Sequence, residues 1–219
     1  MSSRTAWPLC ETEACSADLE EPVRRRLAWW VERPSEHARF LNTLALMEHI
    51  GSRKIMVSQT GGDLDQEVLK HLAEEARHAY FFKRSAEGLA RQSLPFDDVS
   101  AIRPASARMY FGRLDASIAD ALGPVTSSEI PYLYVSLTIE LRAVWTYRLY
   151  HEALVAAGAT LSLKGILAEE ELHLQHMLDR LEALGADPAG RIPAFARLED
   201  RLFRSFWMQL DTAALAQAA

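Results

Sequence analysis

The sequence predicts an all-helical protein. Apolar residues recur at the three- and four-residue spacing of a helix face over several long stretches, and no segment shows the strict alternation that is typical of a strand. No repeat of solenoid length is present. The chain has 219 residues, of which 49% are hydrophobic, so it is long enough to bury a sizeable core.

Capping residues and prolines indicate where the first helices begin and end. Residues 1–20 are expected to form a loose leader. Asp18 can cap a short helix that carries Pro22 in its first turn and ends at Pro34. A first long helix is expected over residues 35–57, because its apolar stripe continues without a break.

The middle of the chain changes in character. The segment SQTGGD predicts a turn, after which Asp63 can cap a second long helix that ends near Leu89. Residues 91–130 contain three prolines and are expected to form a long crossover, with one helix at about 105–122. A crossover of this length can carry the chain from one end of a helical bundle to the other.

The third and fourth long helices follow the crossover. The third is expected over about 131–157, and Gly158 can form its C-terminal cap. The fourth is expected from about Ala159 or Ser162 to Leu184. A last amphipathic helix is expected over 193–210.

The domain organisation follows from these elements. We expect a single helical domain over residues 21–219. Its bundle core is expected at about 35–185, with extra helices at the N- and C-terminal ends.

The fourth long helix carries a carboxylate and an imidazole on its apolar face. Glu170 and His173 lie three residues apart within a stripe formed by Ile166, Leu167, Leu174, Met177 and Leu181. The second long helix repeats the arrangement, with Glu75 and His78 among Val68, Leu72, Ala79 and Phe82. Because burying an unpaired charge is costly, such a pair needs a reason, and two Glu-x-x-His pairs on two long helices are much stronger evidence for a site than one.

The first long helix carries a further carboxylate, Glu48, that is expected to face the second long helix. Glu48 lies within the apolar stripe of the first helix and is 27 residues before Glu75. The midpoint of the pair falls between the two glycines of the expected turn, so Glu48 and Glu75 should face each other.

The partner of Glu170 on the third helix is not fixed by the same argument. Glu140 and Glu152 are both candidates, and a turn centred on Gly158 misses the midpoint of either pairing by about three residues. At ~1.5 Å of rise per residue this is roughly 9 Å of axial mismatch in both cases. Hairpin geometry alone therefore leaves both carboxylates open.

This order of residues resembles the ferritin-like di-metal carboxylate proteins. In that superfamily a four-helix bundle supplies one Glu from each of two helices and a Glu-x-x-His from each of the other two. The resemblance covers about residues 35–185. The segment IELRAVWTYRLYHEAL followed by LAEEELHLQH is similar to the tRNA-modifying hydroxylase branch, and the expected bundle also resembles that of rubrerythrin-like proteins. It implies a ferritin-like fold, and it selects Glu140 with Glu152 as the alternative. The implied metal ligands are Glu48, Glu75, His78, Glu140, Glu170 and His173.

The chemistry of this ligand set favours two iron ions, with manganese or a mixed iron/manganese pair as variants. Four ionised carboxylates in an apolar core repel one another, and two divalent cations cancel their charge. Oxygen-rich ligands with a minority of imidazole suit iron or manganese. We expect no catalytic side chain beyond the metal ligands.

The leading functional hypothesis is a di-iron oxidoreductase that activates O2 to oxidise or hydroxylate a small organic substrate. An external electron donor is expected, because the sequence has two cysteines rather than a four-cysteine rubredoxin-like segment. The alternatives are iron oxidation or peroxide scavenging of ferritin or rubrerythrin type, and a helical binding module with a structural metal. A homodimer is compatible with either enzymatic hypothesis.

Composition disfavours other classes of protein. The net charge of −6 argues against general nucleic-acid binding, which needs clustered Lys and Arg. No apolar run approaches the ~20 residues that span a bilayer, and the N-terminus lacks the apolar core of a signal peptide, so we expect a cytoplasmic protein without membrane contact. Cys10 and Cys15 lack the neighbours of a zinc or iron site.

Overall fold

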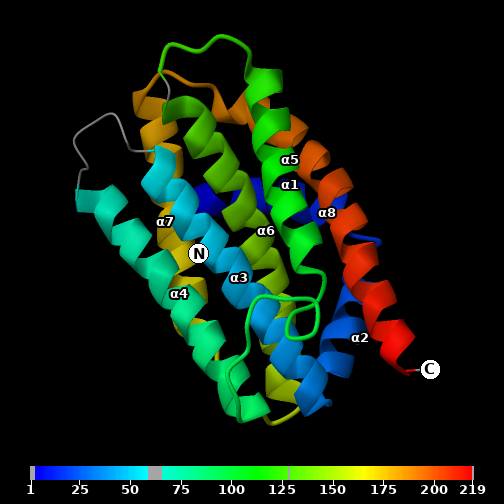
Figure 1. Ribbon diagram of the computed structural model, residues 1–219. Helices are drawn as coiled ribbons and strands as arrows, with labels where there is room; N and C mark the ends of the chain where they lie inside the picture. The colour runs from blue at the N-terminus through cyan, green and yellow to red at the C-terminus, as the bar shows by residue number, and fades with distance from the viewer. Residues whose placement is uncertain (1–2, 59–65, 128, 219) are drawn as a thin grey trace. The chain divides into compact units, whose positions relative to one another are not determined.

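A computed structural model describes residues 3–58, 66–127 and 129–218. Within these ranges the chain is all-helical, with eight helices and no strand (Figure 1). The helices are α1 (Ser3–Cys15), α2 (Glu20–Val31), α3 (Pro34–Ser58), α4 (Gln66–Ala90), α5 (Pro104–Leu122), α6 (Glu129–Ala156), α7 (Lys164–Ala183) and α8 (Pro188–Ala218). The prediction of an all-helical protein is confirmed for this part of the chain. None of the described helices is both long and apolar enough to cross a membrane.

The chain divides into two compact units. One comprises Met1–Leu27 and Gly112–Arg204, and the other comprises Ala28–Phe111 and Ser205–Ala219. We call them unit 1 and unit 2, and each is described by itself. The boundaries fall inside α2, α5 and α8. The single domain expected over residues 21–219 stays a prediction.

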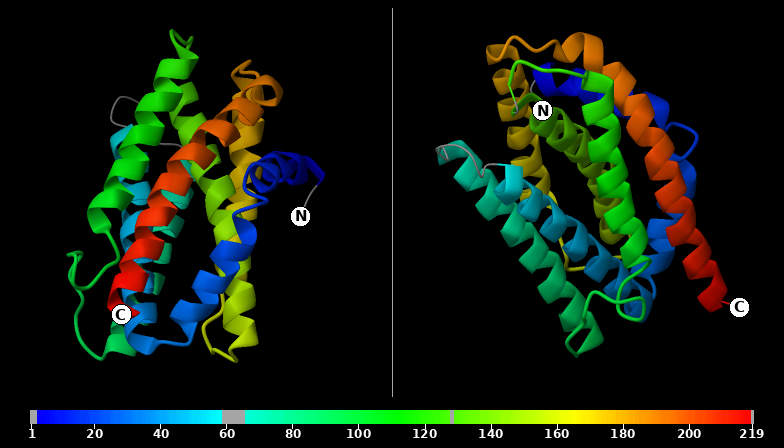
Figure 2. Two further views of the ribbon diagram at one scale, coloured as in Figure 1. Left: turned by 90° about the vertical axis from the view of Figure 1, so that its right-hand side faces the viewer. Right: turned by 45° about the horizontal axis from the view of Figure 1, so that its top comes forward.

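Unit 2 is built on a hairpin of α3 and α4, which run side by side along their length (Figures 1 and 2). Its aromatic core includes the buried Trp30, which stacks on Phe40 at 4.4 Å between ring centroids and meets Trp207 edge-on at 5.6 Å. The expected cap at Asp63, and most of the expected turn, lie outside the described residues.

The segment between α4 and α5 is fastened to the α3–α4 hairpin by side chains. The buried amide of Asn42 donates hydrogen bonds to the carbonyl oxygens of Pro95 and Ser100, at 3.0 and 2.9 Å. Lys83 donates to Asn42 Oδ1 at 2.9 Å and also to the carbonyl of Leu94. This connection therefore has a defined path in unit 2.

Unit 1 is built on a hairpin of α6 and α7, and α1 packs against both helices (Figure 2). The expectation of a loose leader is wrong for Ser3–Cys15, because these residues form α1, which buries Leu9 and Thr12. Gly158 ends α6 as expected, with a φ of +63° and a hydrogen bond from the N–H of Ala159 to the carbonyl of Leu154 at 2.9 Å.

A buried ion pair ties α6 to α8 within unit 1. Arg142 donates three hydrogen bonds to the carboxylate of Glu199, at 2.6 to 3.0 Å, and its third nitrogen donates to Ser16 Oγ at 2.9 Å. Ser16 donates in turn to Asp200 at 2.8 Å, and Arg204 donates to the other oxygen of Asp200 at 2.6 Å. Because the guanidinium binds the carboxylate of Glu199 through two of its nitrogens, this network fixes the register of α6 against α8.

The pH dependence of stability can be predicted from His37 on α3. Burial lowers the pKa of this imidazole from 6.5 to about 4. As the pH falls from 7 to 5, the unfolded chain takes up a proton that the folded chain does not, so the free energy of unfolding falls. The loss expected from this one group is about 2 kcal/mol.

Denaturant unfolding at pH 7 and pH 5 measures this effect. His37→Gln should lose about 2 kcal/mol less than the wild type between the two pH values. His49→Gln is the matched control, because His49 is exposed on the same helix. Equal losses in the wild type and in His37→Gln would show that the buried imidazole is not responsible.

Candidate metal centre

In unit 2, α3 and α4 bring together two carboxylates and an imidazole. Glu48, Glu75 and His78 are all buried, and each offers a ligand atom within 4.8 Å of those of the other two. The distances of Glu48 and Glu75 from the expected turn predicted that these two residues face each other. Both helices present these residues inward because each lies in the apolar stripe that packs the hairpin.

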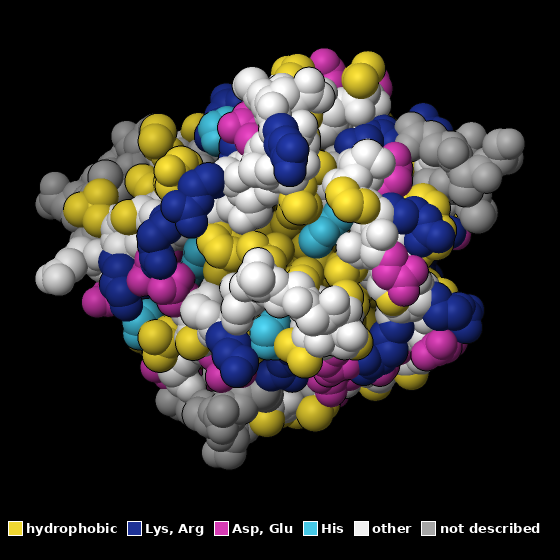
Figure 3. Space-filling model, turned by 90° about the horizontal axis from the view of Figure 1, so that it is seen from below, with side chains coloured by type: hydrophobic (Ala, Val, Ile, Leu, Met, Phe, Trp, Pro, Cys, Tyr) yellow, Lys and Arg dark blue, Asp and Glu magenta, His cyan; other side chains and the backbone are white. Residues whose placement is uncertain are grey.

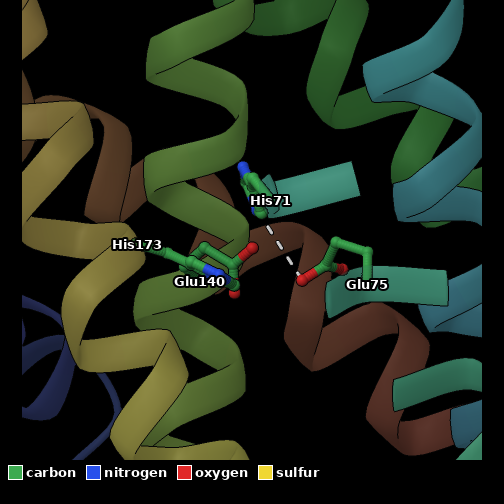
Figure 4. Close-up of side chains that lie close together, drawn as sticks. All are labelled: His71, Glu75, Glu140 and His173. Carbon is green, nitrogen blue, oxygen red and sulfur yellow. Dashed lines mark ion pairs between the residues drawn. The ribbon is translucent and has the colours of Figure 1, made fainter. Parts of the chain in front are cut away.

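His71 also faces this group. Its Nε2 lies 3.6 Å from Oε1 of Glu75, which is one turn further along α4 (Figure 4). His78 Nδ1 lies 3.7 Å from the same oxygen. Burial raises the pKa of the Glu75 carboxyl, but the two facing imidazoles outweigh burial and hold the pKa below its usual range. Glu75 is therefore an ionised carboxylate at neutral pH.

Gly51 makes room for the Glu75 carboxylate. A Cβ atom at Gly51 would lie 3.1 Å from Oε2 of Glu75, which is tighter than an ordinary contact. A glycine within a helix is costly, and this one lies three residues after Glu48. Gly51 was not among the predicted site residues, although a glycine near a buried Glu in the middle of a long helix is a usable signal.

Gly51→Ala should therefore separate stability from metal binding. We expect the metal-free protein to gain less than the ~0.5–1 kcal/mol that a better helix former gives at an open position, because the Glu75 carboxylate has to move. We expect weaker metal binding, because the new methyl group displaces the carboxylate of Glu75. Denaturant unfolding without metal and metal titration against a competing chelator measure the two effects.

Gly88→Ala on α4 is the matched control for that experiment. A Cβ at Gly88 would meet nothing within 4 Å, so this variant should gain stability and keep its metal affinity. Metal affinities of Gly51→Ala and Gly88→Ala that match the wild type would show that the space beside Glu75 has no role in metal binding.

In unit 1, α6 and α7 bring together a second set of two carboxylates and an imidazole. Glu140, Glu170 and His173 are buried, with exposed fractions of 6%, 1% and 4%. His173 Nδ1 lies 2.9 Å from Oε2 of Glu170, a hydrogen bond when Nδ1 carries the proton. Glu140 and His173 offer ligand atoms within 4.8 Å of each other, and their side chains approach from α6 and α7 (Figure 4).

The two carboxylates that hairpin geometry left open on α6 have different surroundings. Glu140 is buried next to His173, whereas the side chain of Glu152 is 56% exposed and pairs with Arg24. Twelve residues turn an α-helix by three full turns and about 120°, so the two side chains leave α6 in different directions. This arrangement supports Glu140, and its role as a ligand stays a prediction.

Beyond these two sets, the described residues contain no further group of His, Cys, Asp and Glu side chains of this kind. His49 and His176, which adjoin the Glu-containing motifs in sequence, are exposed. Lys and Arg are interspersed with Asp and Glu on the face drawn in Figure 3, where no extended patch of one sign is visible. The chain thus buries carboxylate and histidine groups that could bind metal ions.

Comparisons with protein-family models, with curated proteins and with solved structures found no match. A functional interpretation therefore depends on the chemistry of the two buried residue sets.

Proposed function

We propose that this protein is a di-iron carboxylate oxidoreductase that uses O2 to oxidise or hydroxylate a small organic molecule. One observation carries the proposal. In each unit a hairpin of long helices buries two carboxylates together with an imidazole that lies close to one or both of them. We propose that Glu48, Glu75, His78, Glu140, Glu170 and His173 hold one pair of cations in a ferritin-like arrangement of α3, α4, α6 and α7.

Charge is the main support for a metal pair. Glu48 and Glu75 have oxygen atoms within 4.8 Å of each other, and both are buried. Two ionised carboxylates at that separation in a medium of low polarity repel strongly and lose their hydration. Two divalent cations would balance the four carboxylates of both sets, while the neutral imidazoles complete the shell without adding charge.

The donor atoms support iron or manganese rather than a soft metal. Carboxylate oxygens outnumber imidazole nitrogens, and neither Cys10 nor Cys15 is among these residues. When bound, a pair of irons supplies the redox chemistry that O2 activation requires. Hydroxylation consumes one O2, two electrons and two protons for each C–H bond converted to C–OH, with release of one water. We propose that a separate reduced protein supplies the two electrons.

Besides binding the cations, the six proposed ligand side chains orient one another and exclude water. The contact between His173 and Glu170 holds both groups in place on α7, because each limits the rotation of the other. Burial of all six residues keeps bulk water away from the reacting groups, which protects reactive species from side reactions.

Anaerobic reduction of the iron-loaded protein followed by exposure to O2 tests the proposal. We expect two irons per chain and an oxo-bridged ferric absorption band after O2 is added. Tightly held zinc with no response to O2 would contradict the proposal and would favour a structural metal. Rapid oxidation of excess iron with mineral formation would instead favour a ferritin-type function.

A further inference from the structure

We propose that His71 is a third imidazole ligand, bound to the same cation as Glu75. This inference rests on the proposed metal centre and adds to it a residue outside the six ligands. Helix α4 would then provide three ligands from one face, His71, Glu75 and His78, at successive turns.

The distances on α4 fit a shared cation. Two donor atoms that each bind one ion at ~2.0–2.2 Å lie about 2.8–3.6 Å apart when the bond angle is between a right angle and the tetrahedral angle. His71 Nε2 and His78 Nδ1 lie 3.6 and 3.7 Å from Oε1 of Glu75. A small rotation of either ring would bring it to the expected separation.

Burial supports the same assignment. The side chain of His71 is 12% exposed and points toward Glu75 from the preceding turn (Figure 4). The position that corresponds to His71 on α7, four residues before Glu170, is the buried Ile166. His71 is therefore not part of the repeated Glu-x-x-His pattern, and α4 offers one more imidazole than α7.

This difference between the two helices predicts unequal metal positions. With His71 added, three imidazoles are shared by two cations, so one cation would have two imidazole ligands and the other would have one. Because imidazole strengthens the binding of later divalent metals, we expect the two equivalents of Zn²⁺ to bind with different affinities.

The experiment compares His71→Gln with the wild type in Zn²⁺ titrations against a chromogenic chelator. Gln keeps an N–H near the place of Nε2 but is a poor metal ligand, so it separates coordination from hydrogen bonding. We expect His71→Gln to lose about 100-fold in affinity for one Zn²⁺ and to keep the other. His176→Gln is the matched control, because His176 is exposed on α7 near His173, and it should bind both ions as the wild type does.

A second measurement uses wild-type protein with ¹⁵N-labelled histidine, so it does not depend on the folding of a variant. We expect the ring nitrogens of His71 to shift on addition of Zn²⁺, and those of His176 to stay in place. Unshifted His71 nitrogens, or two Zn²⁺ bound by His71→Gln with wild-type affinity, would overturn the ligand assignment while leaving the metal centre intact. A wild-type protein that binds no Zn²⁺, Fe²⁺ or Mn²⁺ would overturn the proposed function itself.

Discussion

Replacing Glu140 by Ala should remove at least one cation from the metal-loaded protein, whereas replacing Glu152 by Ala should leave both in place. Both residues are glutamates on α6. Glu140 is buried beside His173, whereas Glu152 is paired with Arg24 at an exposed position. Elemental analysis after gel filtration gives the number of metals per chain for each variant.

The free energy of unfolding, measured with and without metal, tests the same two variants independently. A cation present at 100 times its Kd stabilises the folded chain by about 2.7 kcal/mol. Glu140→Ala should lose most of this gain, and its metal-free form should be no less stable than the wild type because a buried carboxylate has been removed. If only Glu152→Ala lost metal, the assignment on α6 would be wrong.

Replacing Glu199 by Ala should destabilise unit 1 by about 3–5 kcal/mol, because the guanidinium of Arg142 would be left buried without its carboxylate. Both side chains are almost fully buried, at 4% for Arg142 and 1% for Glu199. A loss of this size is a large part of the free energy of unfolding of an ordinary domain. Denaturant unfolding of the metal-free protein measures it.

An exposed pair of the same chemistry is the control for Glu199. Arg180 and Glu129 also make two hydrogen bonds, each of 2.7 Å, but the Arg180 side chain is 51% exposed. Glu129→Ala should cost about 1 kcal/mol or less, because surface ion pairs contribute little. Replacing both Arg142 and Glu199 by Leu should restore much of the stability that Glu199→Ala loses. Equal losses for Glu129→Ala and Glu199→Ala would contradict this explanation.

The long helices were predictable because their apolar stripes run for many turns. The helix expected over residues 35–57 is observed as Pro34–Ser58, and the helix expected over 131–157 is observed as Glu129–Ala156. The inward direction of Glu75 and His78 follows from the same stripes, since their spacing places both on the buried face. Local spacing was therefore sufficient for these elements and for the two Glu-x-x-His pairs.

Other features depend on contacts between residues far apart in sequence. Helix α1 contains Pro8, which is unfavourable inside a helix, and it buries Leu9 against the rest of unit 1. The partner of Arg142 is 57 residues away on α8, so no local pattern could indicate it. Glu140 and Glu152 both have apolar neighbours at helical spacing in the sequence, so the pattern on α6 could not indicate which carboxylate is buried.

The most direct test of the proposed centre is the anomalous scattering of crystals loaded with iron and measured above and below the iron absorption edge. We predict two peaks about 3.5–4 Å apart, the separation of two-metal sites, with Glu48, Glu75, Glu140 and Glu170 around them. Peaks located elsewhere, or no peak beside Glu75 and Glu170, would contradict it.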